Sequence, residues 1–349
     1  MGTNRLQVRG HSFPRGSLAE RVISFAKSRP MLTFGIAALA TSAVVNRHLA
    51  NKAERQHPAY GRFLDLDGVR LHYTERGRGE PLILLHGNGS MLEDFESSGL
   101  IKLAAKQFRV IAFDRPGFGR SSRPRGTVWT PNAQAHLIHA ALRILGVEHA
   151  TVLGHSWGAS VAIALGIRFP ALVSSLILAS GYYYPTIRAD VPILAAPAIP
   201  VFGDLLSYTV SPVLSRALWP LLLRKLFGPA PVPEKFRGFS REMAVRPSQI
   251  RAGAAEAALM IPDAFGLSGA YRELKMPVVI VAGEDDRLID IDRQSARLHQ
   301  EVTQSTFHRL PRVGHMVHQT STDAVMSAII EASERARDQR ASEILPIAA

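Results

Sequence analysis

The chain has 349 residues, of which 46% are apolar and 20% are charged, a balance typical of folded globular proteins. This length suits one large domain with an insertion, and the composition excludes general disorder. The chain contains no cysteine, which excludes disulfides, thiolate metal sites and cysteine catalysis.

The formal net charge of +12 is unevenly distributed, because residues 1–57 hold nine Lys and Arg residues against only Glu20 and Glu54. Such a basic segment suits nucleic acid or an anionic membrane surface. Neither a zinc-finger spacing nor an RNA-binding aromatic motif accompanies it, so we expect no nucleic-acid partner.

Residues 31–45 form an apolar run of fifteen residues without a charge. As a helix, the run covers roughly 22 Å of a hydrocarbon core about 30 Å thick, and Arg29 and Arg47 can snorkel at its ends. We expect a single membrane-anchoring helix; a cleaved signal and a soluble amphipathic helix are the alternatives. More basic residues precede the run than follow it, which predicts a cytoplasmic N-terminus and an extracytoplasmic catalytic body.

After a charged linker at 46–60, short apolar runs alternate with segments of helical periodicity. Residues 63–66 and 69–73, joined by Asp67-Gly68, are typical of a β-hairpin. Further strands are predicted at 81–85, 108–113, 150–153, 172–179, 277–281 and 306–310, and helices at 100–106, 132–145, 159–168, 293–301 and 322–335. This alternation indicates an α/β fold with a doubly wound, mostly parallel sheet.

One long stretch breaks the alternation. Residues 182–274 show no strand pattern and are rich in Pro, Leu and Ala, which predicts a helical cap inserted into the body. The expected organisation is a basic N-terminal segment (1–57), a body (58–181 and 275–338), the cap (182–274) and a loose tail (339–349).

The sequence Gly154-His155-Ser156-Trp157-Gly158 fits the pattern G-x-S-x-G between a predicted strand and a predicted helix. A sharp strand-to-helix turn needs small residues on both sides, and it presents the serine at the edge of the sheet. Ser156 is therefore the candidate nucleophile.

A serine nucleophile needs a base. His315 lies just after the last predicted strand, so it reaches the same edge of the sheet. The other histidines near it in the sequence are interpreted as core or surface residues: His299, His308 and His318.

The base in turn needs an orienting carboxylate. The loop after the strand at 277–281 is the best source, because the loop after the preceding strand carries no acid. The spacing leaves open which of its four acids is used: Glu284, Asp285, Asp286 or Asp290.

The sequence His86-Gly87-Asn88-Gly89-Ser90 follows the strand predicted at 81–85. Glycines on both sides of Asn88 let the backbone approach a bound acyl group, so the N–H groups of Asn88 and Trp157 are the candidate oxyanion hole. The alternative is a tight turn without a catalytic role, and His86 is interpreted as structural.

With serine, acid and histidine in this chain order, the segment from about residue 61 to 333 resembles the α/β-hydrolase superfamily. Residues 114–121 (DRPGFGRS) add to the likeness, because the superfamily often carries D-x-x-G-x-G-x-S after its fourth strand. The resemblance implies Asp286, three residues after a glycine, as the triad acid, and it matches His315 to a G-H motif. The most similar branch contains haloperoxidase-like hydrolases, carbon–carbon bond hydrolases and haloalkane dehalogenases.

The chain departs from part of that branch at the nucleophile. Haloalkane dehalogenases and epoxide hydrolases resemble it at H-G-N and at the Trp after the nucleophile, but they attack with aspartate where this chain has Ser156. Epoxide opening also needs cap tyrosines as acids, and Tyr208 and Tyr271 are interpreted as packing residues. The resemblance therefore implies a serine hydrolase that forms an acyl-enzyme.

We expect the substrate to be a carboxylic ester or a related acyl compound, cleaved without a metal or an organic cofactor. A carbon–carbon bond hydrolase, a perhydrolase and a non-catalytic binding protein of the same fold are the alternatives. The apolar cap predicts a small apolar substrate. A pocket roof made of apolar side chains has no polar groups that would lose their hydration when the substrate binds. Its apolar residues are Leu205, Leu206, Val213, Leu218, Trp219, Leu221, Leu222, Leu223 and Phe227.

Overall fold

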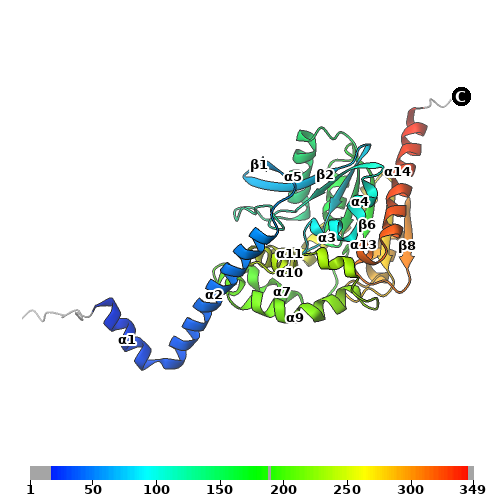
Figure 1. Ribbon diagram of the computed structural model, residues 1–349. Helices are drawn as coiled ribbons and strands as arrows, with labels where there is room; N and C mark the ends of the chain where they lie inside the picture. Colours follow the sequence, from blue (N-terminus) through cyan, green and yellow to red (C-terminus); the bar gives the residue numbers. More distant parts are fainter. Residues whose placement is uncertain (1–16, 188–189, 345–349) are drawn as a thin grey trace, which may run out of the picture.

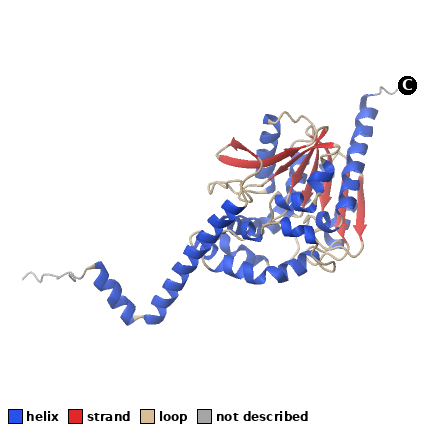
Figure 2. Cartoon of the chain, viewed as in Figure 1, coloured by secondary structure: helices blue, strands red, loops and turns tan. Residues whose placement is uncertain are grey.

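The computed structural model describes residues 17–187 and 190–344, and within them it forms an eight-stranded sheet in the order β1-β2-β4-β3-β5-β6-β7-β8 (Figures 1 and 2). β2 pairs antiparallel with β1 and β4, and all other neighbours are parallel. The strands are β1 (Arg62–Leu66), β2 (Val69–Arg76), β3 (Glu80–Leu85), β4 (Phe108–Phe113), β5 (Ala150–His155), β6 (Val173–Ala179), β7 (Val278–Gly283) and β8 (Ser305–Leu310). The predicted α/β class with a mostly parallel sheet is confirmed.

The hairpin of β1 and β2 forms where Asp67-Gly68 predicted it. Asp67 (φ 48°) and Gly68 (φ 76°) both adopt the left-handed conformation that a two-residue hairpin turn requires. Leu66 therefore pairs directly with Val69, which sets the register of the whole hairpin.

Helices cover both faces of the sheet, as a doubly wound fold requires (Figure 2). α5 (Pro131–Ile144) and α6 (Trp157–Arg168) share one core cluster with alternate strand residues, and α4 (Leu100–Ala104) and α14 (Thr322–Ile344) share the other. Successive side chains of a strand point to opposite faces. Because both faces are apolar here, the central strands are continuous hydrophobic runs in the sequence.

Between β6 and β7, the described residues of the predicted cap range form helices and no strand. The cap lies beyond the carboxyl ends of the parallel strands (Figure 2). Its aromatic cluster, which includes Phe227 and Phe236, packs against Met91 and Met316 of the body. The cap helices are α7 (Val191–Ala195), α8 (Phe202–Tyr208), α9 (Val210–Phe227), α10 (Arg241–Ala244) and α11 (Pro247–Ser268).

The linker predicted at 46–60 is wrong over most of its length. After α1 (Leu18–Ser28), the helix α2 runs from Pro30 to Gln56 without a break and so includes both the apolar run and the charged segment. The charged segment consists mainly of Ala, Leu, Lys, Arg and Glu, which are strong helix formers. The helix ends at His57 because the following Pro58 disfavours helical geometry in the residue before it.

No single helix in the described ranges is both long enough and apolar enough to cross a membrane. The predicted transmembrane anchor finds no support, because residues 31–45 are only part of α2, whose remainder is polar. The extracytoplasmic position of the body depended on that anchor and stays a prediction. The basic residues Arg5, Arg9 and Arg15 lie outside the described residues.

The tail predicted to be loose from residue 339 is helical as far as Ile344, where α14 ends. This prediction was wrong because residues 339–344 contain neither Gly nor Pro, so no signal ends the helix before that point. Residues 345–349 lie outside the described residues.

Candidate active site

Ser156 occupies the turn between β5 and α6 with φ 54° and ψ −120°. A positive φ is costly for a residue with a side chain and persists only where the surroundings enforce it. Here the backbones are packed too tightly for any residue but glycine on either side. A Cβ on Gly158 would lie 2.1 Å from the carbonyl oxygen of Leu85, and one on Gly154 would lie 2.3 Å from that of Gly158.

His315 and Asp286 form a buried hydrogen-bonded pair at the adjacent strand ends. Nδ1 of His315 lies 2.7 Å from Oδ2 of Asp286, and the two side chains are 3% and 2% exposed. The other carboxylate oxygen accepts the backbone N–H groups of Leu288 (2.8 Å) and Ile289 (2.9 Å). A carboxylate accepts hydrogen bonds, so Nδ1 carries the hydrogen and Nε2 is left to take a proton.

The other acids of the same loop point elsewhere. Glu284, Asp285 and Asp290 are exposed. Asp290 accepts the backbone N–H groups of the next short helix instead. The geometry therefore singles out Asp286 among the four candidates, and its catalytic role stays a prediction.

His155 links the serine turn to the histidine loop. Its Nε2 lies 3.1 Å from the carbonyl oxygen of His315, and the two rings are 5.0 Å apart. Because His155 directly precedes Ser156, this contact brings the candidate nucleophile and base to one place. Among the described residues, Oγ of Ser156 makes no hydrogen bond; the bond between nucleophile and base often closes only when substrate binds.

The two backbone N–H groups of the candidate oxyanion hole donate to no acceptor in the described part of the chain. Trp157 is the first residue of α6, so its N–H has no partner within the helix. Gly87 lets the Asn88 loop approach the serine turn, since a Cβ on Gly87 would lie 3.0 Å from Cβ of Ser156. These free donors suit an oxyanion hole, and that role stays a prediction.

Arg115 holds the Asn88 loop from the buried side. Its Nε donates to the carbonyl oxygen of His86 (2.7 Å) and its Nη2 to that of Gly87 (2.9 Å). The backbone N–H of Arg115 also donates to Nε2 of His86 (3.0 Å). Burial, together with the charge of Arg115, lowers the pKa of His86 to about 3, so this histidine is neutral and serves as a structural acceptor.

Glu256 of α11 pairs with Arg115, and neither side chain is exposed. Nη2 of Arg115 donates to Oε2 of Glu256 at 3.0 Å, and a second bond joins Nη1 to Oε1. Gln134 bridges both partners, at 2.9 Å and 3.0 Å. This pair ties the cap to the Asn88 loop. Sequence reasoning missed it; the available signal was a single acid inside the apolar stretch QIRAGAAEAALMI.

The motif at 114–121 has a structural role. The carboxylate of Asp114 accepts the backbone N–H groups of Leu92 (2.8 Å) and Arg120 (2.9 Å) and lies 2.6 Å from Nδ1 of His72. A Cβ on Gly119 would lie 2.0 Å from this carboxylate, which explains the glycine. The motif thus fixes the chain at the carboxyl end of β4.

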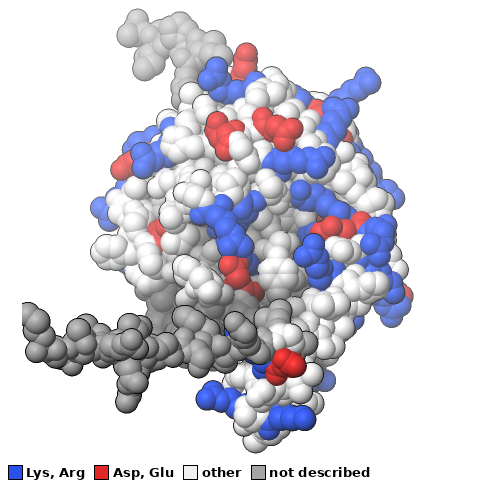
Figure 3. Space-filling view, turned by 90° about the vertical axis from the view of Figure 1, so that its left-hand side faces the viewer, with Lys and Arg blue, Asp and Glu red and all other residues white. Residues whose placement is uncertain are grey.

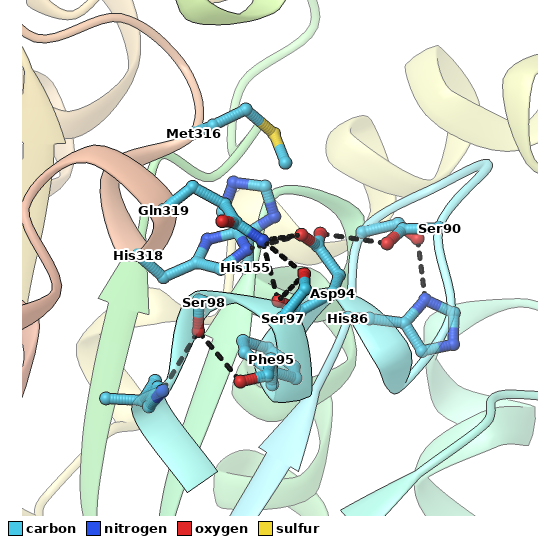
Figure 4. A network of polar contacts seen from close by, with 12 residues as sticks. His86, Ser90, Asp94, Phe95, Ser97, Ser98, His155, Met316, His318 and Gln319 are labelled. Carbon is cyan, nitrogen blue, oxygen red and sulfur yellow. Dashed lines mark hydrogen bonds and ion pairs between the residues drawn. The ribbon is translucent and has the colours of Figure 1, made fainter. Parts of the chain in front are cut away.

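A second buried cluster, formed by Asp94, His155 and His318, lies behind the candidate triad. Figure 4 shows Asp94 between Ser90 and Gln319, which donate to its carboxylate at 2.9 Å and 2.8 Å. Nε2 of His318 lies 3.0 Å from Oδ1 of Asp94, and its ring lies 4.4 Å from that of His155. Sequence reasoning took His318 as an ordinary core or surface residue and missed this cluster.

The ligand atoms of this cluster lie within 4.8 Å of one another, which is a spacing that a metal ion accepts. Burial alone would raise the pKa of Asp94, but His318, His155 and Gln319 hold it well below its ordinary range. Burial and the charges of His318 and His315 lower the pKa of His155. Ser90 and Gln319 thus serve an ionised Asp94, whereas Nδ1 of His155 and Nδ1 of His318 are buried without a hydrogen-bond partner in the described chain.

The two cap tyrosines do not form a pair of acids. The hydroxyl of Tyr271 is buried and donates to the carbonyl oxygen of Tyr183. Tyr208 lies at the end of α8 with an exposed side chain. The interpretation as a packing residue fits Tyr271, whereas the exposed Tyr208 does not pack in the interior.

A surface hollow of about 530 Å³ lies away from this chemistry, at the edge of the body near Arg272 and Gln304. None of the candidate triad residues lines it. The Ser156 turn therefore stays the candidate site.

Comparison with known proteins places the chain among hydrolases. A family model described as the alpha/beta hydrolase fold matches residues 80–322, more than half of the chain. Haloalkane dehalogenase 2 of Mycobacterium tuberculosis is 27% identical over 288 residues, covering 79% of this chain and 95% of its own. The 2-hydroxy-6-oxononadienedioate/2-hydroxy-6-oxononatrienedioate hydrolase of Paraburkholderia phymatum is 25% identical over 260 residues, covering 71% and 85%. The solved structure of an epoxide hydrolase, CorEH, is 25% identical with a TM-score of 0.64, covering 78% and 97%.

Proposed function

The chain belongs to the α/β-hydrolase fold family, and we propose that it is a serine hydrolase that cleaves a carboxylic ester or related acyl substrate through an acyl-enzyme. Proteins similar to it over most of their length are hydrolases, so the chain is a hydrolase. We propose which bond it cleaves and which residues cleave that bond.

One observation carries the proposal: Ser156 sits in a left-handed turn beside the hydrogen-bonded pair of His315 and Asp286. A strained turn of this kind exposes the hydroxyl at the edge of the sheet instead of burying it in a helix. A histidine whose Nδ1 is engaged by a buried carboxylate presents Nε2 as a base. The three side chains therefore supply a nucleophile, a base and its support.

The proposed reaction has two halves. Oγ of Ser156 attacks the substrate carbonyl carbon while Nε2 of His315 takes the hydroxyl proton, and Asp286 stabilises the resulting imidazolium. The N–H groups of Asn88 and Trp157 receive the oxyanion. His315 returns the proton to the leaving oxygen, and a water that it then deprotonates hydrolyses the acyl-enzyme and frees Ser156.

Dehalogenation and epoxide opening are not proposed, although the similar proteins include a dehalogenase and an epoxide hydrolase. These families attack with aspartate, whose ester product water can hydrolyse. Ser156 in that position would displace a halide to give an ether, which histidine-activated water does not cleave. The substitution of serine therefore favours a carbonyl substrate, because only an acyl-enzyme turns over.

A carbon–carbon bond hydrolase is the second candidate, favoured by the likeness to the Paraburkholderia phymatum hydrolase. The same residues would serve, but the leaving group would be carbon and would need a neighbouring carbonyl to stabilise its charge. The substrate would then be a diketone. Comparing turnover of a nitrophenyl ester with that of a diketone separates the two candidates.

The apolar roof expected from the cap sequence is not formed by all of its predicted residues. Trp219 and Leu223 pack with Phe227 inside the cap. Leu206 is half-buried, and the other predicted roof residues of α8 and α9 are exposed to solvent: Leu205, Val213, Leu218, Leu221 and Leu222. An apolar substrate stays a proposal, supported by the apolar residues packed around Met91 and Met316 next to the catalytic loops.

Labelling with a fluorophosphonate probe tests the nucleophile directly. The wild-type chain should be labelled, and Ser156→Ala should abolish both labelling and ester turnover. Ser160→Ala is the matched control, because Ser160 lies one turn further along α6 and bonds only to the carbonyl oxygen of Tyr182 (3.1 Å). An unlabelled but correctly folded wild-type chain would instead identify a binding protein of this fold.

A further inference from the structure

The outer side of the cap and the two N-terminal helices expose large apolar side chains over a broad surface. On α2, Met31 is 89% and Phe34 is 77% exposed; on α9, Leu221 is 62% exposed. We call this surface the apolar face and define it by Met31 and Phe34 of α2, Val201 and Phe202 at the start of α8, and Leu218 and Leu221 of α9. Figure 1 shows these elements on the side of the molecule away from the sheet.

The arrangement of α2 against the cap is fixed by buried and partly buried polar contacts. Oγ of Ser42 donates to the carbonyl oxygen of Thr209 (2.8 Å), and Nδ2 of Asn46 donates to those of Tyr208 (3.0 Å) and Thr209 (2.9 Å). Arg216 of α9 donates to Oδ1 of Asn46 (2.8 Å). The helix is therefore held at the α8–α9 junction, while its first half projects beyond the cap (Figure 1).

The second half of α2 is also held in place, by contacts of Glu54. Arg246 forms an ion pair with Glu54 at 2.5 Å, and Arg120 donates to the carbonyl oxygen of Glu54 (2.9 Å). All of these contacts lie in or near the second half of α2. No described part of the chain covers its apolar first half, which therefore stays exposed. Something outside the described chain must cover Met31 and Phe34 if they are to leave water.

The border of the apolar face is basic. Lys27 and Arg29 stand at the bend between α1 and α2, and Arg47, Lys52 and Arg55 follow on α2. Glu20 and Glu54 are the acids of these two helices, and Glu54 is already paired with Arg246. Figure 3 shows basic side chains more widely spread than acidic ones on the side from which these helices project.

A bent pair of cap segments adds to the apolar character. Residues Val191–Ala198 and α8 meet at 99° and together have the apolar length of a broken membrane span. α7, which opens this pair, has no buried residue. A core segment of similar composition would be shielded by its neighbours, whereas Ile193 and Val201 are exposed.

We propose that the apolar face docks into the headgroup region of an anionic lipid bilayer, with α1, the first half of α2 and the outer sides of α8 and α9 lying in the interface. Apolar side chains flanked by Lys and Arg are the pattern of such monotopic helices, which lie on a membrane and do not cross it. A second copy of the chain suits the face less well, because it would bring the same basic border into the contact. The inference stands apart from the catalytic proposal.

Vesicle flotation of the full chain tests the docking. The chain should float with vesicles of phosphatidylglycerol and phosphatidylcholine, and much less with phosphatidylcholine alone. High salt should weaken the binding only in part, because salt screens the charges and leaves the apolar contacts. Charge reversal at the bend, Lys27→Glu with Arg29→Glu, should remove the preference for the anionic vesicles.

Matched substitutions test which surface docks. Leu221→Asp on the apolar face should lower vesicle binding by about tenfold or more, from the loss of one buried leucine alone. Ile144→Asp is the control, because Ile144 at the end of α5 is equally exposed, at 60% against 62%. Neither residue belongs to the catalytic machinery, so ester turnover and circular dichroism should confirm an intact fold.

Four outcomes would overturn the proposal. The first is that the chain fails to float with either kind of vesicle, and the second is that the Leu221→Asp variant binds vesicles as the wild type does. In the third case, only Phe34→Asp weakens vesicle binding, which would restrict the contact to the N-terminal helix. Sedimentation velocity tests whether a second copy of the chain binds the apolar face instead of a membrane. A wild-type dimer that Leu221→Asp turns into a monomer, without vesicle binding, would assign the face to a second copy of the chain.

Discussion

Glu256 of the cap and Arg115 of the body form a bidentate ion pair that no solvent reaches, and the same guanidinium holds the carbonyl groups of His86 and Gly87. The cap is thereby connected to the loop that carries Asn88. A substitution in this pair should therefore affect both the stability of the fold and the position of the proposed oxyanion hole.

We expect Glu256→Gln to lower the free energy of unfolding by about 3–5 kcal/mol, because it leaves the charge of Arg115 buried without its partner. Urea unfolding measures the change. Glu242→Gln is the control: Glu242 pairs with Arg216 at 2.9 Å in a partly exposed position, and such pairs contribute at most about 1 kcal/mol. The double variant Arg115→Met with Glu256→Leu should recover part of the loss; equal losses in the double and single variants would contradict this account.

Asp286→Asn should reduce kcat for ester hydrolysis by a factor on the order of 10⁴, because an amide in place of Oδ2 disturbs the tautomer of His315. Asp285→Asn is the matched control one residue earlier, with an exposed side chain, and should retain nearly full activity. Steady-state kinetics on both variants checks the assignment. A large loss in the Asp285 variant alone would move the triad acid to that position.

Asp263 of α11 should make the fold less stable near neutral pH. Burial, and then the charge of Glu256, raise its pKa to about 6, and one carboxylate oxygen is buried without a hydrogen bond in the described chain. A raised folded-state pKa means that the group favours the fold below its unfolded value of about 3.9, and that this contribution is lost as the pH rises through about 6.

Asp263→Asn should therefore raise the melting temperature at about pH 7.5 and leave it nearly unchanged at about pH 4. Thermal unfolding at the two pH values measures the difference. Asp65→Asn, at an exposed position of β1, provides the control for the substitution itself. A stabilisation of equal size at both pH values would mean that the ionisation of Asp263 is not its cause.

Gly158→Ala should destabilise the fold and abolish labelling of Ser156. The new Cβ would meet the carbonyl oxygen of Leu85 at 2.1 Å, and both backbones lie in the core of the molecule. Overpacking at such a place costs typically about 1–3 kcal/mol. Gly126→Ala, where a Cβ meets nothing within 4 Å, is the control for the substitution itself. Wild-type stability and labelling in Gly158→Ala would show that the turn can relax.

The strands of this fold were predictable because those of the parallel sheet are buried on both faces. β4 spans the same residues as the apolar run that indicated it, and the predicted β5 is short by only two residues, Gly154 and His155. Spacing did not single out Asp286 among the acids of its loop, but the meeting of Ser156, His315 and this loop at one edge of the sheet was predictable for a related reason. Each follows a strand of the parallel sheet, and the carboxyl ends of those strands meet at one edge.

What was missed depends on contacts between distant parts of the chain. The pairing of Arg115 with Glu256 spans 141 residues, and neither local spacing nor composition indicates which acid meets which base. Asp94 and His318 meet only because α3 (Glu93–Ser98) and α13 (Val317–Thr320) lie together. The linker at 46–60 was mispredicted because its charges suggested a solvated coil, whereas the same residues favour a helix that the cap can bind.

The hydrogen bond between Asn46 and Thr209 joins residues that lie 163 positions apart in the chain, which affects the order in which a nascent chain can fold. At a synthesis rate of about 5–20 residues per second, α2 leaves the ribosome roughly 10–30 s before its partner in the cap. During that time Ser42 and Asn46 have no acceptor in the cap, so α2 is not yet held at the α8–α9 junction. α2 is thus made well before its binding site in the cap exists, and it is open to a chaperone or a membrane throughout the interval.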